Sequence, residues 1–232
     1  MSKSALIVGA GPGISASFAR KLAAAGYQVH LASRDTAKLQ DLVRAIDGQA
    51  HTCDVLQDGA ITALFGKLDD TDVTPDVVLY NPSFRERGPF LELDAERTRK
   101  ALLVTAYGGF IVAQEAARRM VPRGSGTILF TGASASVKGY PQSAPFAMGK
   151  FALRGLAQSM ARELAPQGIH VAHFIIDGGV RNPDRPERID APDNPDSMLD
   201  PDAIADSYMH VLAQPRTAWT WEIELRPWVE KF

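Results

Sequence analysis

Seven short runs rich in β-branched and aliphatic residues recur along the 232-residue chain, and helix-length segments separate them. The runs span residues 5–10, 28–33, 50–55, 75–81, 126–132, 170–177 and 219–225. In the segment before the sixth run, one helix face carries Leu153, Leu156, Met160 and Leu164. Strands that alternate with helices predict a parallel sheet covered on both faces. We therefore expect one α/β domain over residues 1–232, with a doubly wound sheet of about seven strands.

Charge and composition narrow the classes of partner. The formal net charge of -2 offers no basic field for nucleic acid. The single cysteine, Cys53, excludes an intrachain disulfide and a Cys-based zinc site, and it fits a reducing compartment. The histidines show no metal-ligand spacing, and no segment reaches the roughly 18 apolar residues of a membrane span. We expect a cytoplasmic protein with a small-molecule partner and with no nucleic-acid, membrane or metal partner.

The stretch LIVGAGPGIS places Gly9, Gly11, Gly13 and Ile14 between the first run and the following helix. Glycines there let the backbone turn sharply and approach a pyrophosphate, whose charge a helix N-terminus favours. A glycine-rich turn also occurs in ordinary strand-to-helix connections, but its place at the start of a β-α repeat is typical of a dinucleotide site. The turn therefore predicts a Rossmann-like sheet that binds NAD or NADP.

The end of the second run indicates which of the two cofactors is bound. It reads LASRD, so Ser33 stands where an acid commonly holds the ribose hydroxyls of NAD, and Arg34 follows at once. A guanidinium suits a 2′-phosphate. Asp35 keeps NAD possible as the alternative. We expect NADP.

Several further stretches make the chain resemble the short-chain dehydrogenases/reductases. They are CDV at 53–55, YNPS at 80–83, GTILFTGASAS from 126, and FAMGKFALRGLAQSMARELAPQGIHVAHFIIDGG from 146. The resemblance implies hydride transfer between a nicotinamide and a carbonyl or alcohol. Asp54 is also a candidate N-cap of the next helix. The glycine-rich turn and the family resemblance together predict the following cofactor-binding positions: Gly9, Gly11, Gly13, Ile14, Ser33, Arg34, Asp54, Val55, Asn81, Lys150, Gly178 and Val180.

The catalytic positions depart from that family. Phe146 stands where the resemblance expects the tyrosine that serves as acid or base, and Lys150, four residues on, shares its helix face. Phe146 has no ionisable proton, so the family's usual proton transfer is excluded. Thr105 falls on the family's asparagine. The family's serine falls on Ala133, with Ser134 next to it.

Another group must supply a proton if the chain catalyses reduction. Lys150 itself, or a water that it positions, is the favoured candidate. Ser134 is the second candidate, as a hydroxyl that orients substrate. Tyr140 and Ser143 precede the active-site helix and are less favoured, since a tyrosine on a loop is more often a surface or packing residue.

Residues 181–202 are dense in Pro, Asp and Arg and predict a mobile loop. We interpret it as a substrate lid, with a solvated surface excursion as the alternative. The family resemblance implies a homodimer or homotetramer. Core and subunit contacts would account for Trp219, Trp221 and Trp228 near the C-terminus.

Two functions are compatible with these features. The first is an NADP-dependent oxidoreductase with a non-standard proton donor. The second is an NADP-binding protein of the same fold without redox turnover, as a sensor or a regulatory subunit. The retained lysine and the long loop favour the enzyme.

Overall fold

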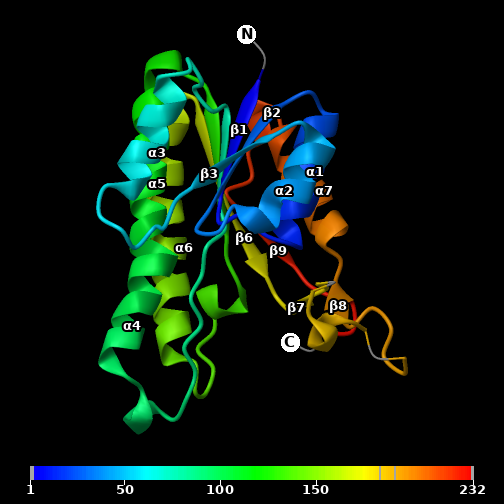
Figure 1. Cartoon of the computed structure of the whole chain (residues 1–232). Coiled ribbons are helices and arrows are strands. Elements are labelled where there is room, and N and C mark those ends of the chain that lie inside the picture. Colours follow the sequence, from blue (N-terminus) through cyan, green and yellow to red (C-terminus); the bar gives the residue numbers. More distant parts are fainter. Residues whose placement is uncertain (1–2, 183, 191, 231–232) are drawn as a thin grey trace.

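The computed structural model describes residues 3–182, 184–190 and 192–230. In this part of the chain, seven parallel strands form one sheet in the order β3-β2-β1-β4-β5-β6-β9 (Figure 1). Their bounds are β1 Ser4–Val8, β2 Gln28–Ser33, β3 Gln49–Thr52, β4 Val77–Tyr80, β5 Gly126–Thr131, β6 Ile169–Ile176 and β9 Glu222–Leu225. This order is that of a doubly wound Rossmann-like sheet, which confirms the predicted fold class.

Helices cover both faces of the sheet. Figure 1 shows α1, α2 and α7 on one side and α3, α4, α5 and α6 on the other. Their bounds are α1 Ile14–Ala24, α2 Gln40–Ile46, α3 Ala60–Asp69, α4 Ala95–Leu102, α5 Gly108–Met120, α6 Ala144–Leu164 and α7 Pro201–Leu212. None of the helices described is long and apolar enough to cross a membrane.

The first strand shows why this sequence folds with two covered faces. Ala5 and Ile7 belong to the cluster that packs on α1 and α7, whereas Leu6 and Val8 belong to the cluster that packs on α3, α5 and α6. Successive side chains of a strand point to opposite faces, so a strand buried on both must be apolar throughout. The continuous run at this position is therefore a consequence of the double cover.

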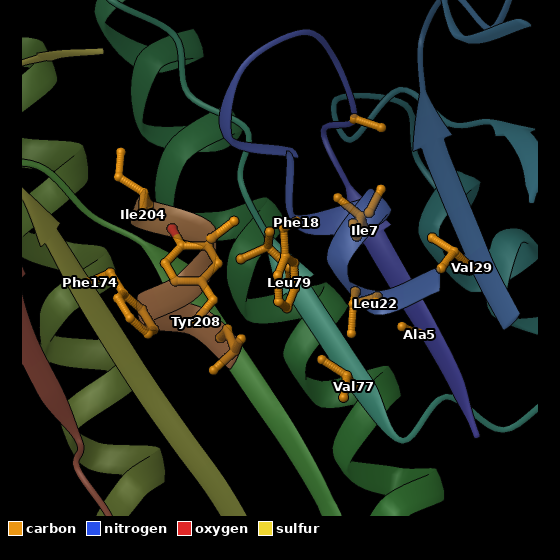
Figure 2. Packing of buried hydrophobic residues seen from close by; sticks show 14 of the residues in the cluster. Ala5, Ile7, Phe18, Leu22, Val29, Val77, Leu79, Phe174, Ile204 and Tyr208 are labelled. Atoms are coloured by element: carbon orange, nitrogen blue, oxygen red, sulfur yellow. The ribbon is translucent and has the colours of Figure 1, made fainter. Parts of the chain in front are cut away.

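Aromatic rings fill the core between α1, α7 and the sheet. The rings of Phe18 and Tyr208 meet edge to face at 5.2 Å, and Phe174 of β6 lies 4.0 Å from the same tyrosine (Figure 2). The fully buried Tyr208 hydroxyl forms a hydrogen bond with the Thr131 hydroxyl at 3.0 Å. A buried tyrosine needs such a partner, and this one attaches α7 to the end of β5.

Helix α6 ends at the last residue of its predicted apolar face, but five of the seven strands are shorter than their apolar runs. Helix α6 ends at Leu164, and Gly168 takes a φ of +81° before β6 begins. The predicted last strand, 219–225, begins only at Glu222, and Trp219 before it stacks on His170 at 4.6 Å. Strand β3 ends at Thr52, so the third run loses its last three residues.

The predicted lid, residues 181–202, lies within the described residues except at positions 183 and 191. It contains the short strand β8 (Met198–Leu199), which pairs with β7 (Gly179–Val180). The Arg181 guanidinium lies 2.5 Å from the Asp190 carboxylate, which also accepts a hydrogen bond from the first amide of β8. These contacts organise part of the segment, and its role as a lid stays a prediction.

We expect Leu22→Ala to lower the free energy of unfolding by about 2–5 kcal/mol, because Leu22 is fully buried between α1 and the sheet (Figure 2). Leu91→Ala is the matched control, since Leu91 is 95% exposed and its loss should change stability by less than about 0.5 kcal/mol. Urea unfolding of both variants checks the difference. Equal losses would contradict the described core.

Candidate functional site

The glycine-rich turn joins β1 to α1 in a conformation that needs glycine. Gly9 has a φ of +80°, and a Cβ added to it would lie 2.7 Å from Pro82. Gly13 caps α1 with a φ of +86°. Among the described residues, α1 has no side-chain cap and no acidic residue in its first turn. The amide groups at this helix N-terminus are therefore available to an anion such as a pyrophosphate.

Asn81 holds this turn in place from the end of β4. Its side-chain amide donates to the Gly9 carbonyl at 3.2 Å and to the Ser15 hydroxyl at 2.8 Å. The Ser15 hydroxyl in turn donates to the same carbonyl at 3.2 Å. Two neighbouring strand ends thus fix the turn, and the sequence had indicated Asn81 as a cofactor-binding position.

A cavity of about 1020 Å³ opens beside the turn, at the carboxyl ends of β1, β2 and β4. The crossover connections run to opposite faces of the sheet at this point, and open α/β sheets bind their ligands at such a point. Seven of the residues predicted to bind cofactor line it, namely Gly9, Gly11, Ser33, Arg34, Asp54, Val55 and Asn81. Its size is sufficient for a dinucleotide.

Basic side chains line the end of the cavity beyond β2. Arg34 is exposed there, and Arg20 of α1 and Lys38 line the same cavity. Asp35 is occupied by local contacts: its carboxylate accepts from the Ala37 amide at 3.1 Å and lies 3.5 Å from the Lys38 ammonium. Sequence reasoning missed Arg20, which lies on a helix with no motif of its own.

Asp54 does not cap a helix, and that interpretation is wrong. Helix α3 begins at Ala60, with Gly59 at its N-cap position. The Asp54 carboxylate instead accepts from the Leu56 amide at 3.0 Å, within the turn that follows β3. This turn places Asp54 on the cavity wall.

The remaining predicted positions lie outside the cavity lining. Gly178 and Val180 follow β6, where Gly178 has a φ of +146° and Val180 pairs with Leu199. Ile14 begins α1, and Gly13 is its N-cap. The four predicted catalytic positions, Lys150, Ser134, Phe146 and Thr105, are likewise absent from the lining of the described cavity.

Lys150 and Phe146 lie buried side by side on α6. Lys150 is 2% exposed, and its ammonium donates to the Thr131 carbonyl at 2.7 Å and lies 5.9 Å from the centre of the Phe146 ring. Burial, with the charge of Arg85 as a second cause, lowers the pKa of Lys150 to about 7. Near neutral pH this lysine is therefore able both to donate and to accept a proton.

Arg85 covers the position that the resemblance gives to the catalytic acid. Its guanidinium lies 4.5 Å from the centre of the Phe146 ring. The segment 84–88, which we call the arginine loop, is held by the Gly88 amide, which donates to the Gln142 carbonyl at 3.1 Å. Sequence reasoning missed Arg85, and the only available signal was its place shortly after the end of β4.

Thr105 lies in a π-helical segment, Leu103–Tyr107, between α4 and α5. Its hydroxyl accepts a hydrogen bond from the Phe84 amide at 3.4 Å, and the Tyr80 hydroxyl donates to the Val104 carbonyl. π-Helical turns are rare and are frequent at functional sites. Here the segment connects the helix layer to the base of the arginine loop.

Ser136 belongs to a buried chain of hydrogen-bonded side chains, which we call the relay. Its hydroxyl lies 3.3 Å from the His173 imidazole, whose other nitrogen lies 3.1 Å from the Glu222 carboxylate. Ser136 and His173 are both 0% exposed, so this serine–histidine–glutamate arrangement has no access for a substrate. The relay fastens the segment that carries Ala133 and Ser134 to β6 and β9.

The candidate hydroxyls differ in accessibility. Ser134 is half-buried at the start of a short 3-10 helix, Ser134–Ser136. Tyr140 is 42% exposed, and Ser143 is 4% exposed, next to α6. Burial alone therefore favours Ser134 over Ser143 as a hydroxyl that a substrate can reach.

Comparisons with known proteins agree with this arrangement. A family model described as Enoyl-(Acyl carrier protein) reductase matches residues 9–194. L-xylulose reductase from Bos taurus is 35% identical over 171 residues, which are 72% of this chain and 68% of that protein. A crystal structure of a short-chain dehydrogenase from Rhodopseudomonas palustris is 36% identical, with a TM-score of 0.83 over 97% of this chain and 99% of the other.

A metagenomic short-chain oxidoreductase, solved in complex with NADP, shares the fold with a TM-score of 0.83 at 24% identity, over 98% of both chains. The chain thus belongs to the short-chain dehydrogenases/reductases, a family of NAD(P)-dependent oxidoreductases, and the resemblance seen in the sequence is confirmed.

The buried lysine makes stability depend on pH. The folded pKa of about 7 lies below the ordinary value of 10.5, so the unfolded chain binds an extra proton between these limits. The free energy of unfolding of the wild type, relative to Lys150→Met, should therefore rise from about pH 7 to about pH 9.5 and stay level below about pH 6. Urea unfolding across this range checks the trend. Parallel profiles would contradict the depressed pKa.

Proposed function

We propose that the protein is an NADP-dependent oxidoreductase in which Phe146 occupies the place of the family's tyrosine and Lys150 supplies the proton. One observation carries the proposal: the Lys150 ammonium is buried beside the Phe146 ring, and its pKa is about 7. A general acid is most effective when its pKa is near the working pH. A lysine of ordinary pKa would release its proton far less readily.

The residues present fit a bound NADP. The glycine-rich turn and the uncapped N-terminus of α1 would hold the pyrophosphate, and Arg34, with Arg20 beside the same cavity, would hold a 2′-phosphate. Asp54 and Val55 would border the adenine, and Asn81 supports the turn. The bound cofactor supplies the hydride.

The reactive end would be completed by residues around α6 and β6. Lys150 would contact the nicotinamide ribose, and the backbone from Gly178 to Val180 would contact the carboxamide, as the family resemblance implies. Ser134 would orient the substrate through its hydroxyl. The Thr105 hydroxyl already accepts from the Phe84 amide, so its role is to position the arginine loop.

A reduction adds one hydride and one proton to the substrate. In this proposal the proton leaves the Lys150 nitrogen for the substrate oxygen, and the neutral amine then regains a proton from solvent. The Thr131 carbonyl at 2.7 Å keeps the ammonium oriented. Because Lys150 is 2% exposed, a side chain next to it must move before a substrate reaches its ammonium group.

The alternative, an NADP-binding sensor without turnover, is not favoured, because the similar proteins are named as reductases and dehydrogenases.

The segment 181–202 is the proposed lid. A homodimer or homotetramer is part of the proposal. Several large apolar side chains exposed on one helix layer support it: Tyr107, Phe110, Met148 and Phe151.

Removal of Arg34 should weaken NADPH binding and leave NADH binding unchanged. We expect Arg34→Ala to raise the Kd for NADPH by about 10- to 100-fold, because a charged hydrogen bond to the 2′-phosphate is lost. Arg44→Ala is the matched control, since Arg44 lies on α2, pairs with Asp41 and does not line the described cavity. Titration followed by nicotinamide fluorescence measures both. Equal loss for NADPH and NADH would contradict the 2′-phosphate contact.

Lys150→Met should lower turnover by about 100- to 10,000-fold, since it removes the proposed acid. In the wild type, the rate of reduction should fall as pH rises above about 7, where the ammonium loses its proton. NADPH oxidation with activated carbonyl compounds and quinones measures both effects. A Lys150→Met variant that kept its turnover and the same pH profile would exclude lysine as the donor.

A further inference from the structure

The arginine loop lies near two further arginines, Arg185 and Arg188, whose segment also carries Asp184 and Glu187. Arg185 lines the cavity, and an Arg188 guanidinium nitrogen would lie 3.0 Å from a Cβ added to Gly179 on β7. Although Arg85 as a whole is exposed, desolvation of its guanidinium lowers its pKa, and the charges of other arginines lower it further. These neighbours are Arg87, Arg188 and Arg185.

The positive charges of this group are not balanced by ion pairs. Among the residues that the structure describes, Arg85, Arg87, Arg185 and Arg188 form no salt bridge. Glu86, between two of them, pairs with Arg97 at 2.7 Å and is thereby occupied. Like charges held together without ion pairs are costly unless an anion binds among them.

The Phe146 ring orients the Arg85 guanidinium. A flat guanidinium over an aromatic face is attracted by the ring and keeps its edge free for donation. That edge presents paired N–H groups, which match the two oxygens of a carboxylate or phosphate. Arg85 and Lys150 both lie over the Phe146 ring, so an anion bound to Arg85 would lie near the proposed proton donor.

We propose that the substrate is a small carbonyl compound that carries an oxyanion, a carboxylate or a phosphate, and that Arg85 stacked on Phe146 binds this group. Arg87, Arg185 and Arg188 add to the attraction from both sides. The inference rests on the proposed function, because it names the substrate of the same site. Phe146 serves in it as the platform for the anion-binding guanidinium.

The test compares charged and neutral versions of the same carbon skeleton. Unbranched 2-oxo acids and phenylpyruvate are set against their methyl esters, and dihydroxyacetone phosphate against dihydroxyacetone. Binding to the protein saturated with NADP⁺, which prevents turnover, is measured by calorimetry, and kcat/KM is measured by NADPH oxidation. We expect at least one anion to bind about tenfold or more tightly than its neutral partner. The two anion families distinguish carboxylate from phosphate.

Arg85→Gln should abolish this preference, and Arg85→Lys should keep part of it. Arg99→Gln is the matched control, because Arg99 is exposed on α4 and pairs with Glu96. Wild-type protein that binds acids and neutral partners alike, or an anion preference that survives in Arg85→Gln, would overturn the inference. NADPH affinity of the same proteins separates the two proposals. Absent NADPH binding refutes the proposed function, whereas NADPH binding without anion preference refutes this inference alone.

Discussion

Parallel pairing is the constraint on which the site depends. Every pairing of the seven-stranded sheet within the described residues is parallel, so each connection crosses a face of the sheet and all strands finish at one edge. Residues distant in sequence meet there: the turn after β1, Ser33 with Arg34 after β2, and Asn81 after β4. The cavity at this edge is therefore a consequence of topology, and the side chains decide what it binds.

Much of this was visible in the sequence because it rests on local patterns. Apolar runs gave the strands, and the glycine spacing gave the turn, since Gly9 and Gly13 need positive φ whatever lies around them. Asp54 was misread, because nothing local showed that α3 starts as late as Ala60. Arg85 was missed altogether, because its place over Phe146 is set by contacts between distant segments.

Opposing effects set the pKa of the buried Lys150. Desolvation and the charge of Arg85 both disfavour the ammonium, while the Thr131 carbonyl favours it. The resulting pKa of about 7 leaves neither form dominant near neutral pH. Family membership alone would not have indicated this balance, which depends on a phenyl ring and a guanidinium that this chain places around the lysine.

The π-helical segment Leu103–Tyr107 joins a charged helix, α4, to a largely apolar one, α5. A π turn inserts one extra residue, which rotates everything after it by about 100° relative to an uninterrupted α-helix. The insertion therefore acts as a rotational spacer. It allows Thr105 to face the arginine loop while Val112 and Ala116, further along, still point into the core. Deletion of a single residue here would restore a regular α-helix. Either Thr105 would then turn away from the arginine loop, or Val112 and Ala116 would turn away from the core.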